Sequence, residues 1–313
     1  MSFKWIALSG GVGGAKLALG LAHELDPGDL LVVANTGDDF DHLGLRICPD
    51  LDTLMYTLAG CSNSTQGWGL EGETWACMEA LGRLGGETWF RLGDRDLATH
   101  LYRSDRLRHG ATLSQVTHEL SSVLGVRHHI VPMSEARVAT VVITDEGELS
   151  FQDYFVARQC APRVRGVRFE GAENAHMCET LRLALEDDAL RGVIICPSNP
   201  FLSVEPILAI PGVREALATI KAPIVAVSPI VGGQAIKGPT AKMMRELGMD
   251  VSPLGVTEFL RTTIDRIVID LADSSLLPSI RNLGIEATSA PTVMRSLDDK
   301  RSLARAVLEF SGA

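Results

Sequence analysis

Residues 3–16 read FKWIALSGGVGGAK, an apolar run that leads into a glycine-rich stretch. An amphipathic stretch covers residues 15–25, and residues 30–35 read LLVVAN, which is the pattern of a buried strand. The order strand, glycine loop, helix, strand is typical of the start of a parallel α/β sheet. We therefore predict a Rossmann-like, mostly parallel sheet that is flanked by helices.

Further short aliphatic runs fit the same sheet, because parallel strands that are covered on both faces are apolar throughout. Such strands place their carboxyl ends, and the ligands bound there, at one edge of the sheet. We expect the loops after these strands to lie together at that edge. The runs lie at 193–196, 224–227 and 267–271, and the loops of interest follow Leu8, Asn35, Cys196 and Val227.

The middle of the chain has a different pattern. Its apolar residues recur every three or four positions, which predicts helices, and residues 138–156 predict a hairpin that turns at 145–147. We see no linker and no internal repeat, so residues 1–313 are expected to form a single α/β domain. Residues 52–160 would form an inserted helix-rich cap and a small β-hairpin over the binding cleft. The predicted helices cover 51–59, 71–84, 94–108 and 112–124.

The composition excludes several classes of protein. Of the 313 residues, 46% are hydrophobic and 22% are charged, as in an ordinary folded domain. A net charge of −10 and a content of 5% aromatic residues argue against a nucleic-acid partner. No apolar run is long enough to cross a bilayer, so we expect no membrane partner. The six cysteines form no C-x-x-C pair, which favours reduced thiols in a cytoplasmic protein.

The glycine-rich stretch favours phosphate binding. Gly11, Gly13 and Gly14 let backbone N–H groups approach an anion, and Lys16 adds a positive charge. Lys16 also occupies the position of the third glycine in the dinucleotide-binding pattern, which disfavours a nicotinamide-dependent oxidoreductase. Leu17 stands where a Walker loop carries a metal-binding hydroxyl, so this motif is excluded as well.

Five aspartates follow the second predicted strand within a short span. Taken singly, Asp41 and Asp52 are explained by a solvated turn and by helix capping. Together the five would crowd negative charge beside a phosphate site, which is unfavourable unless a cation lies between them. We therefore predict Mg²⁺ bound by Asp38, Asp39 and Asp50.

Two later loops and one central segment also carry candidate binding residues. The turn PSNP at 197–200 places Ser198 and Asn199 after a strand, which favours recognition of a nucleoside. Residues 228–242 supply a second glycine pair and two lysines, whose compact charges suit phosphate oxygens. Residues 89–96 read WFRLGDRD, which fits a helix start as well as a binding loop. The eight histidines show no metal-ligand spacing, and no serine nucleophile motif is present.

Taken together, these blocks resemble the 2-phospho-L-lactate transferase family. They occur in the family's order over residues 9–242, and the combination is specific although each block alone is not. The blocks are SGGVGGAK (9–16), NTGDD (35–39), GLRICPDLDT (44–53), FRLGDRD (90–96), PSNP (197–200) and SPIVGGQAIKGPTAK (228–242).

The resemblance implies a role in the synthesis of coenzyme F420. Family members take a three-carbon acid that is activated by guanosine diphosphate, together with the deazaflavin Fo. The ribityl hydroxyl of Fo attacks the β-phosphorus, which forms a phosphodiester and releases GMP. Members need Mg²⁺ and tend to form homodimers. The transferred group can be 2-phospholactyl, phosphoenolpyruvyl or phosphoglyceryl, and the motifs leave this choice open.

By motif position, the resemblance places Asp50 and Arg91 at the deazaflavin. Asp50 is the catalytic candidate, which would orient the attacking hydroxyl, accept its proton or hold the metal. The glycine loop, Asn35 and the PSNP turn match the nucleotide side, and the second glycine–lysine loop matches the diphosphate. These nucleotide and diphosphate residues are Gly11, Gly13, Gly14, Lys16, Asn35, Thr36, Ser198, Asn199, Gly232, Gly233 and Lys237.

One alternative belongs to a different class of protein. A related group, regulators of the gluconeogenesis-factor type, uses a similar glycine-rich start to bind nucleotide-sugars without catalysis. This interpretation predicts nucleotide binding without Fo binding and without release of GMP. The segments ICPDLDT and FRLGDRD favour the transferase.

Overall fold

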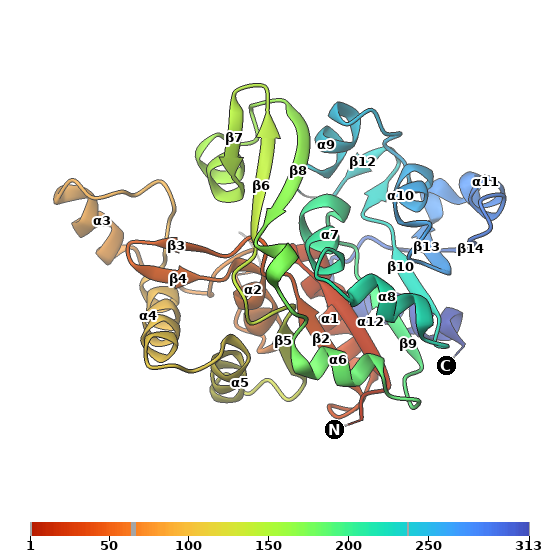
Figure 1. The fold of residues 1–313 in the computed structure, drawn as a ribbon, viewed down its shortest axis with the longest axis horizontal. Coiled ribbons are helices and arrows are strands. Elements are labelled where there is room, and N and C mark those ends of the chain that lie inside the picture. The colour runs from red at the N-terminus through yellow and green to blue at the C-terminus, as the bar shows by residue number, and fades with distance from the viewer. Residues whose placement is uncertain (1, 64–66, 237, 313) are drawn as a thin grey trace.

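A seven-stranded sheet forms the centre of the computed structural model, which describes residues 2–63, 67–236 and 238–312 (Figure 1). Its strands run in the order β14, β13, β10, β9, β1, β2, β5, and every neighbouring pair is parallel. The predicted Rossmann-like sheet is thereby confirmed. The strands are β1 (Trp5–Ser9), β2 (Leu30–Ala34), β5 (His129–Pro132), β9 (Gly192–Ile195), β10 (Ile224–Val227), β13 (Arg266–Asp270) and β14 (Glu286–Ala290).

The chain leaves β1 toward β2 on one side and returns to β9 on the other. The strand order therefore reverses between β1 and β9. After β1 the chain passes to one face of the sheet, and after β9 it passes to the other. Sheets of this kind bind ligands at such a reversal point. The glycine loop follows β1 and the PSNP turn follows β9, so both lie at this point.

Helices cover both faces of the sheet, and β1 shows why. Trp5 and Ala7 pack into the core on one face, while Ile6 and Leu8 pack into the core on the other. Successive strand residues point to opposite faces, so an all-apolar strand must be covered twice. The first face is covered by α1 (Gly11–Glu24), α2 (Pro49–Leu58), α5 (Leu113–Val123) and α12 (Leu297–Ser311). The second is covered by α6 (Glu179–Leu185), α7 (Glu205–Leu208), α8 (Val213–Thr219), α10 (Pro253–Leu260) and α11 (Leu277–Arg281).

Smaller elements surround the carboxyl edge of the sheet. The predicted hairpin is present, with its turn between Thr144 and Gly147, and β8 joins it as a third strand that the sequence did not reveal. Two short hairpins were also not predicted, one within the acidic segment and one after β10. These elements are β3 (Phe40–His42), β4 (Leu45–Ile47), α3 (Ala76–Arg83), α4 (Asp94–Arg108), β6 (Ala139–Thr144), β7 (Gly147–Ser150), β8 (Val164–Glu170), β11 (Ile230–Val231), β12 (Gln234–Ala235) and α9 (Thr240–Glu246).

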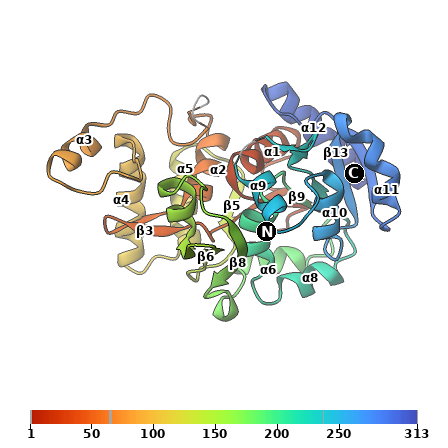
Figure 2. The ribbon, with the colours of Figure 1, turned by 90° about the horizontal axis from the view of Figure 1, so that it is seen from above.

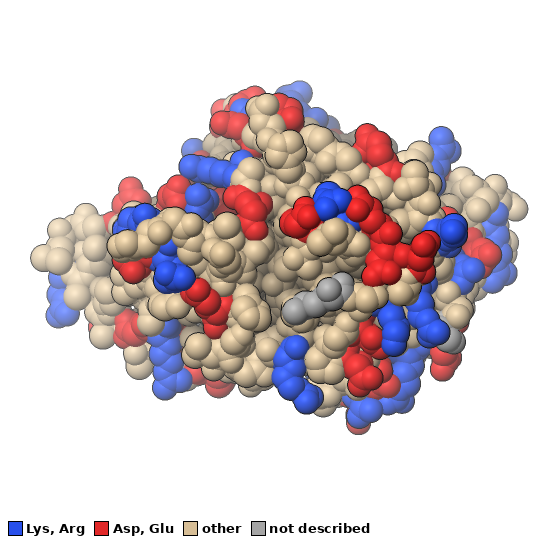
Figure 3. Space-filling model, turned by 60° about the horizontal axis from the view of Figure 1, so that its bottom comes forward, with Lys and Arg blue, Asp and Glu red and all other residues tan. Residues whose placement is uncertain are grey.

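The segment 52–160 contributes to the main sheet as well as to the surroundings of its edge. Its strand β5 pairs with β2, and α2 packs on α1. The division of the chain into one domain with an inserted cap stays a prediction. Among the described helices, none has the length and apolar character that crossing a membrane requires. Acidic and basic side chains are interspersed on the face shown in Figure 3.

An ion cluster ties α1 to α12. Glu24 accepts hydrogen bonds from Arg301 Nε at 2.6 Å and from Arg305 Nε at 2.8 Å. These bonds lower the pKa of Glu24 from 4.5 to about 2. Because the folded-state pKa lies below the ordinary value, the cluster stabilises the fold above pH 4.5. This stabilisation is lost as the pH falls toward 2.

We therefore expect Glu24→Gln to lower the free energy of unfolding by about 1 kcal/mol at pH 7. The difference from the parent should shrink as the pH falls from 4.5 toward 2, because the parent carboxylate is then protonated. Urea unfolding of both proteins at pH 7 and at pH 3 measures this. A difference that stays constant across the two pH values would contradict the assignment.

Candidate functional site

A cleft of ≈ 640 Å³ opens at the carboxyl ends of β1 and β9. Its walls include the glycine loop, the start of α2, the PSNP turn and the start of α9. The prediction that the loops after β1 and β9 lie together is confirmed by direct contacts. Ser198 Oγ accepts a hydrogen bond from Gly10 N at 3.2 Å and donates one to Gly10 O at 2.8 Å. A Cβ on Gly13 would lie 2.4 Å from Pro197 O, so only glycine permits this approach.

Asp50 lies in the first turn of α2 and faces the glycine loop. Its Oδ1 accepts a hydrogen bond from Gly11 N at 2.6 Å, and its Oδ2 accepts one from Asn35 Nδ2 at 2.9 Å. Asn35 is oriented in turn, because its Oδ1 accepts a hydrogen bond from Gly37 N at 2.8 Å. Burial raises the pKa of Asp50 to about 6, although these two hydrogen bonds favour the ionised form. Asp50 is thus a fixed, buried carboxyl group that titrates close to neutral pH.

Asp38 also lines the cleft and lies near Asp50. Burial and the charges of Asp50 and Asp39 raise its pKa well above the usual range. Its Oδ1 is buried and has no hydrogen-bond partner among the described residues. Two crowded carboxylates with an unpartnered oxygen fit a Mg²⁺ site, because Mg²⁺ binds through one or two carboxylates and substrate oxygens.

Asp39 has a different environment from Asp38. It is not among the residues that line the cleft. Burial raises its pKa to about 8, while Cys48 and Arg103 nearby favour the ionised form. Thr36 is also buried and lies outside the lining residues. A role of Asp39 as metal ligand, and of Thr36 at the nucleotide, stays a prediction.

Lys16 brings the C-terminal part of the chain to the cleft. It lines the cleft, and its Nζ donates a hydrogen bond to Met294 O at 3.0 Å. Thr292, another lining residue, donates hydrogen bonds to Asp270 Oδ2 from its N and from its Oγ1, both at 2.8 Å. Residues 292–294 could not be predicted from the sequence, because nothing local marks a segment that approaches the site only in the folded chain.

Only part of the second glycine loop, residues 228–242, lines the cleft. Gly232 and Gly233, with φ values of 56° and 73°, form the two-residue turn between β11 and β12. Such a turn requires positive φ at both positions, which accounts for the glycine pair. Both glycines lie outside the lining residues, whereas Ile236 and the segment 238–240 line the cleft. Lys237 lies outside the described residues.

Asn199 and Arg91 are two further predicted binding residues, and they make different contacts. Asn199 lines the cleft, but its Oδ1 accepts hydrogen bonds from Phe201 N at 2.9 Å and Leu202 N at 3.2 Å, so it also shapes the turn. Arg91 lines the cleft with its guanidinium 4.1 Å from the centre of the Trp75 ring. Tryptophan and phenylalanine side chains also line the cleft, and we call them together the aromatic wall. The aromatic wall consists of Trp68, Trp89, Phe90, Phe151 and Phe155.

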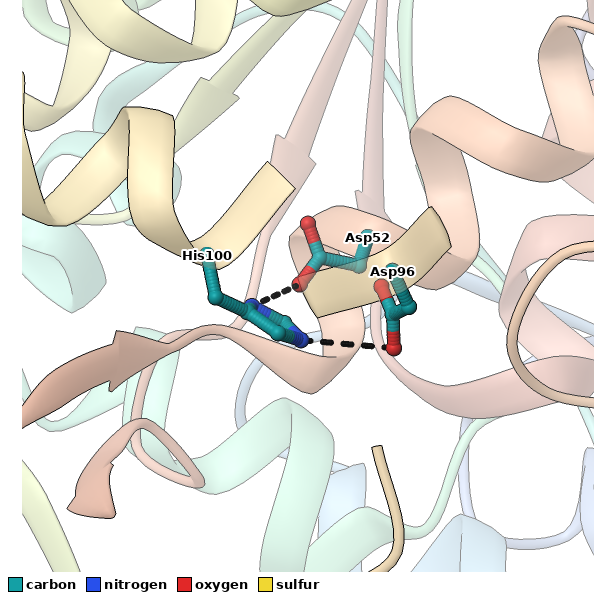
Figure 4. A group of neighbouring side chains, drawn as sticks. All are labelled: Asp52, Asp96 and His100. Carbon is teal, nitrogen blue, oxygen red and sulfur yellow. Dashed lines mark ion pairs between the residues drawn. The ribbon is translucent and has the colours of Figure 1, made fainter. Parts of the chain in front are cut away.

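A buried ion network lies where α2 meets α4 (Figure 4). His100 Nε2 lies 3.3 Å from Asp96 Oδ2, and His100 Nδ1 lies 3.7 Å from Asp52 Oδ2. Asp52 is also paired with the Arg103 guanidinium through both oxygens. Tyr56 Oη donates a hydrogen bond to Asp96 Oδ1 at 2.7 Å. This network was not predicted from the sequence, although Asp96, His100 and Arg103 recur on one face of α4 at helical spacing.

Asp52, Asp96 and His100 lie close enough together to hold a metal ion. The expectation that no histidine has metal-ligand spacing is therefore wrong for His100, which follows Asp96 by four residues. However, the two ring nitrogens face different carboxylates, and Arg103 already neutralises Asp52. A cation bound there would lie beside a guanidinium, so we interpret the group as an ion network at the surface of the cleft, which Asp52, Asp96 and His100 line.

The fold is shared with solved structures. A protein of the UPF0052 family from Bacillus halodurans has a TM-score of 0.64 and 15% sequence identity, over 98% of this chain and 99% of that one. This likeness shows the fold alone.

Sequence comparison gives the family. The model of 2-phospho-L-lactate transferase CofD matches residues 6–295. The chain is 38% identical over 305 residues to a 2-phospho-L-lactate transferase from Methanococcoides burtonii, covering 97% of this chain and 98% of the relative. It is also 38% identical over 313 residues to a phosphoenolpyruvate transferase from Kitasatospora aureofaciens, covering 98% and 97% of the two chains. The chain therefore belongs to the 2-phospho-L-lactate transferase CofD family, a family of transferase enzymes.

Proposed function

We propose that this transferase moves a phospho-(three-carbon acid) group from a guanosine-diphosphate-activated donor to the ribityl hydroxyl of the deazaflavin Fo, with release of GMP, in the synthesis of coenzyme F420. The observation that carries the proposal is the position of Asp50. It lines the same cleft as the glycine loop and the aromatic wall, and it is held by Gly11 and Asn35. A donor phosphate and a planar acceptor can thus meet at one carboxylate.

The donor side of the proposal rests on the glycine loop. This loop begins α1, and a helix N-terminus offers unpaired N–H groups and a favourable dipole to a diphosphate. Lys16 lines the same part of the cleft and adds a positive charge there. Asp38 and Asp50 would hold Mg²⁺, which supplies charge neutralisation at the diphosphate oxygens when it is bound.

The acceptor side rests on the aromatic wall and Asp50. The aromatic wall offers flat apolar surfaces for a deazaflavin ring, and Arg91 adds a hydrogen-bond donor beside them. Asp50 accepts a hydrogen bond from the ribityl hydroxyl and takes its proton as the oxygen attacks phosphorus. Burial favours the protonated form of this carboxyl group, which suits a group that accepts a proton.

The motifs do not distinguish the three candidate groups for transfer, so an experiment must identify the group. Relatives of equal identity are named 2-phospho-L-lactate transferase and phosphoenolpyruvate transferase. Mass spectrometry of the products from Fo with each of the three candidate donors, with Mg²⁺ present, would identify both the reaction and the donor. Nucleotide binding without Fo binding or GMP release would instead favour the regulator.

A homodimer is expected as well, and light scattering of the purified protein checks it.

Removal of divalent cations should abolish turnover, and added Mg²⁺ should restore it. Asp38→Asn should raise the Mg²⁺ concentration that gives half-maximal turnover by about tenfold, because one ligand loses its charge. Asp29→Asn, at the opposite edge of the sheet, serves as the matched control and should leave this concentration unchanged. Parent turnover that continues at full rate in the presence of a chelator would rule out the metal.

A further inference from the structure

Two carboxylates join the helices α3 and α4 in a reciprocal way. Glu73, which precedes α3, accepts hydrogen bonds from Arg95 N at 2.9 Å and Asp96 N at 2.8 Å in the first turn of α4. Asp94, which begins α4, accepts hydrogen bonds from Ala76 N and Cys77 N, both at 3.0 Å, in the first turn of α3. Each acid thus caps the helix of the other segment. We call this pair the Glu73–Asp94 clamp.

The residues at the usual capping positions explain why the clamp is needed. Trp75 precedes α3 and Gly93 precedes α4, and neither makes a side-chain capping bond. The first N–H groups of a helix must find acceptors elsewhere. A Cβ on Gly93 would lie 2.1 Å from Glu73 Cδ, so glycine is required for this close approach. The hydrogen bonds from Thr74 and from Cys77 N lower the pKa of Asp94, which favours the ionised form of this carboxyl group.

The clamp lies at both ends of an arm, residues 73–93, that supplies one side of the cleft. Trp89, Phe90 and Arg91 of this arm line the cleft, and Trp75 holds Arg91. The helix α3 lies at one end of the molecule in both views (Figures 1 and 2). It buries Met78 in a small cluster with Leu92, and its other residues are exposed or half-buried. Apolar burial therefore contributes little to holding α3 in place, and the hydrogen bonds of the Glu73–Asp94 clamp contribute much of the rest.

We propose that Glu73 and Asp94 are positioning residues for the acceptor: by capping α4 and α3 they hold Arg91, Trp89 and Phe90 in place, and this sets the affinity of the cleft for the deazaflavin. The proposal rests on the proposed function. Neither acid is among the residues that line the cleft, so each acts through the arm. The donor side is formed by other elements, and its affinity should not depend on the clamp.

A split between the two Michaelis constants tests this. Glu73→Ala should raise the KM for Fo about tenfold, while the KM for the donor changes less than about twofold. Glu73→Gln keeps an oxygen acceptor and should give an intermediate rise. Glu79→Ala removes the same charge from an exposed side chain of α3 and is the matched control. An unchanged KM for Fo, or an equal rise of both constants, would overturn the proposal.

A second measurement does not depend on turnover. The chain has four tryptophans; Trp75 and Trp89 lie in the arm, Trp68 lies just before it and contacts Trp75, and Trp5 is buried in β1. Acrylamide should therefore quench the fluorescence of Glu73→Ala more strongly than that of the parent or of Glu79→Ala. Equal quenching in all three proteins would contradict the proposal that the clamp holds the arm in place. A parent that quenches as expected but binds no Fo would overturn the proposed function and leave the clamp standing as a structural restraint.

Discussion

Asp50→Asn should lower turnover by at least about 100-fold, while the variant folds like the parent. The amide retains the size of the carboxyl group, so Gly11 N can still donate a hydrogen bond to it. It cannot accept a proton from the attacking hydroxyl, and it loses the negative charge that lies beside Asp38. The rate of GMP release from the donor in the presence of Fo and Mg²⁺ measures the loss, and circular dichroism checks the fold.

Asp41→Asn is the matched control for Asp50→Asn. Asp41 lies in β3 with an exposed side chain that pairs with Arg46 and Arg137, and it is not among the lining residues. Its replacement should change turnover less than about twofold, since surface ion pairs contribute little. If Asp50→Asn formed product at the parent rate, both the proton transfer and the metal contact assigned to Asp50 would be wrong.

Arg103→Met should lower the free energy of unfolding by about 3–5 kcal/mol. Arg103 is buried and pairs with Asp52 through both oxygens, and Asp96 adds a second carboxylate nearby. Methionine fills similar space, so the main cost is a buried carboxylate without its counter-charge. Urea unfolding at neutral pH measures the effect.

The double variant Arg103→Met/Asp52→Asn distinguishes charge from packing. It should recover much of the lost stability, because the unpaired carboxylate is then removed as well. Arg106→Met, whose half-exposed side chain pairs with Glu119, should cost less than about 1 kcal/mol and serves as the control. A double variant no more stable than Arg103→Met would show that packing, rather than charge, sets the role of Arg103.

Local patterns were sufficient to predict most of the sheet and the meeting of the loops after β1 and β9. The runs at β1, β2, β9, β10 and β13 are apolar throughout, and the glycine loop must follow the first of them. Because parallel strands share an edge, this topology alone brought Ser198 to Gly10. The aspartate cluster already indicated Asp50, and the family resemblance implied a catalytic role for it, but no spacing could reveal its contact with Asn35.

The remaining parts of the site depend on contacts between distant segments. The aromatic wall joins side chains from Trp68 to Phe155, which no short window contains. His100 of α4 approaches Asp52 only in the folded chain, because Asp52 belongs to α2. The role of Gly232 could not be predicted for a different reason, because a glycine pair suits a phosphate loop and a tight hairpin turn equally well.

The bond from Lys16 to Met294 O and the packing of α1 against α12 also bear on how the enzyme matures on the ribosome. The first strand and the glycine loop are synthesised early, whereas Thr292 and Met294, which line the same cleft, are synthesised almost last. A nascent chain should therefore stay inactive until translation has passed Met294, so no partly made enzyme consumes its substrates. Stopping translation before residue 292 should yield a protein without turnover, even though Asp50 and the entire glycine loop are present.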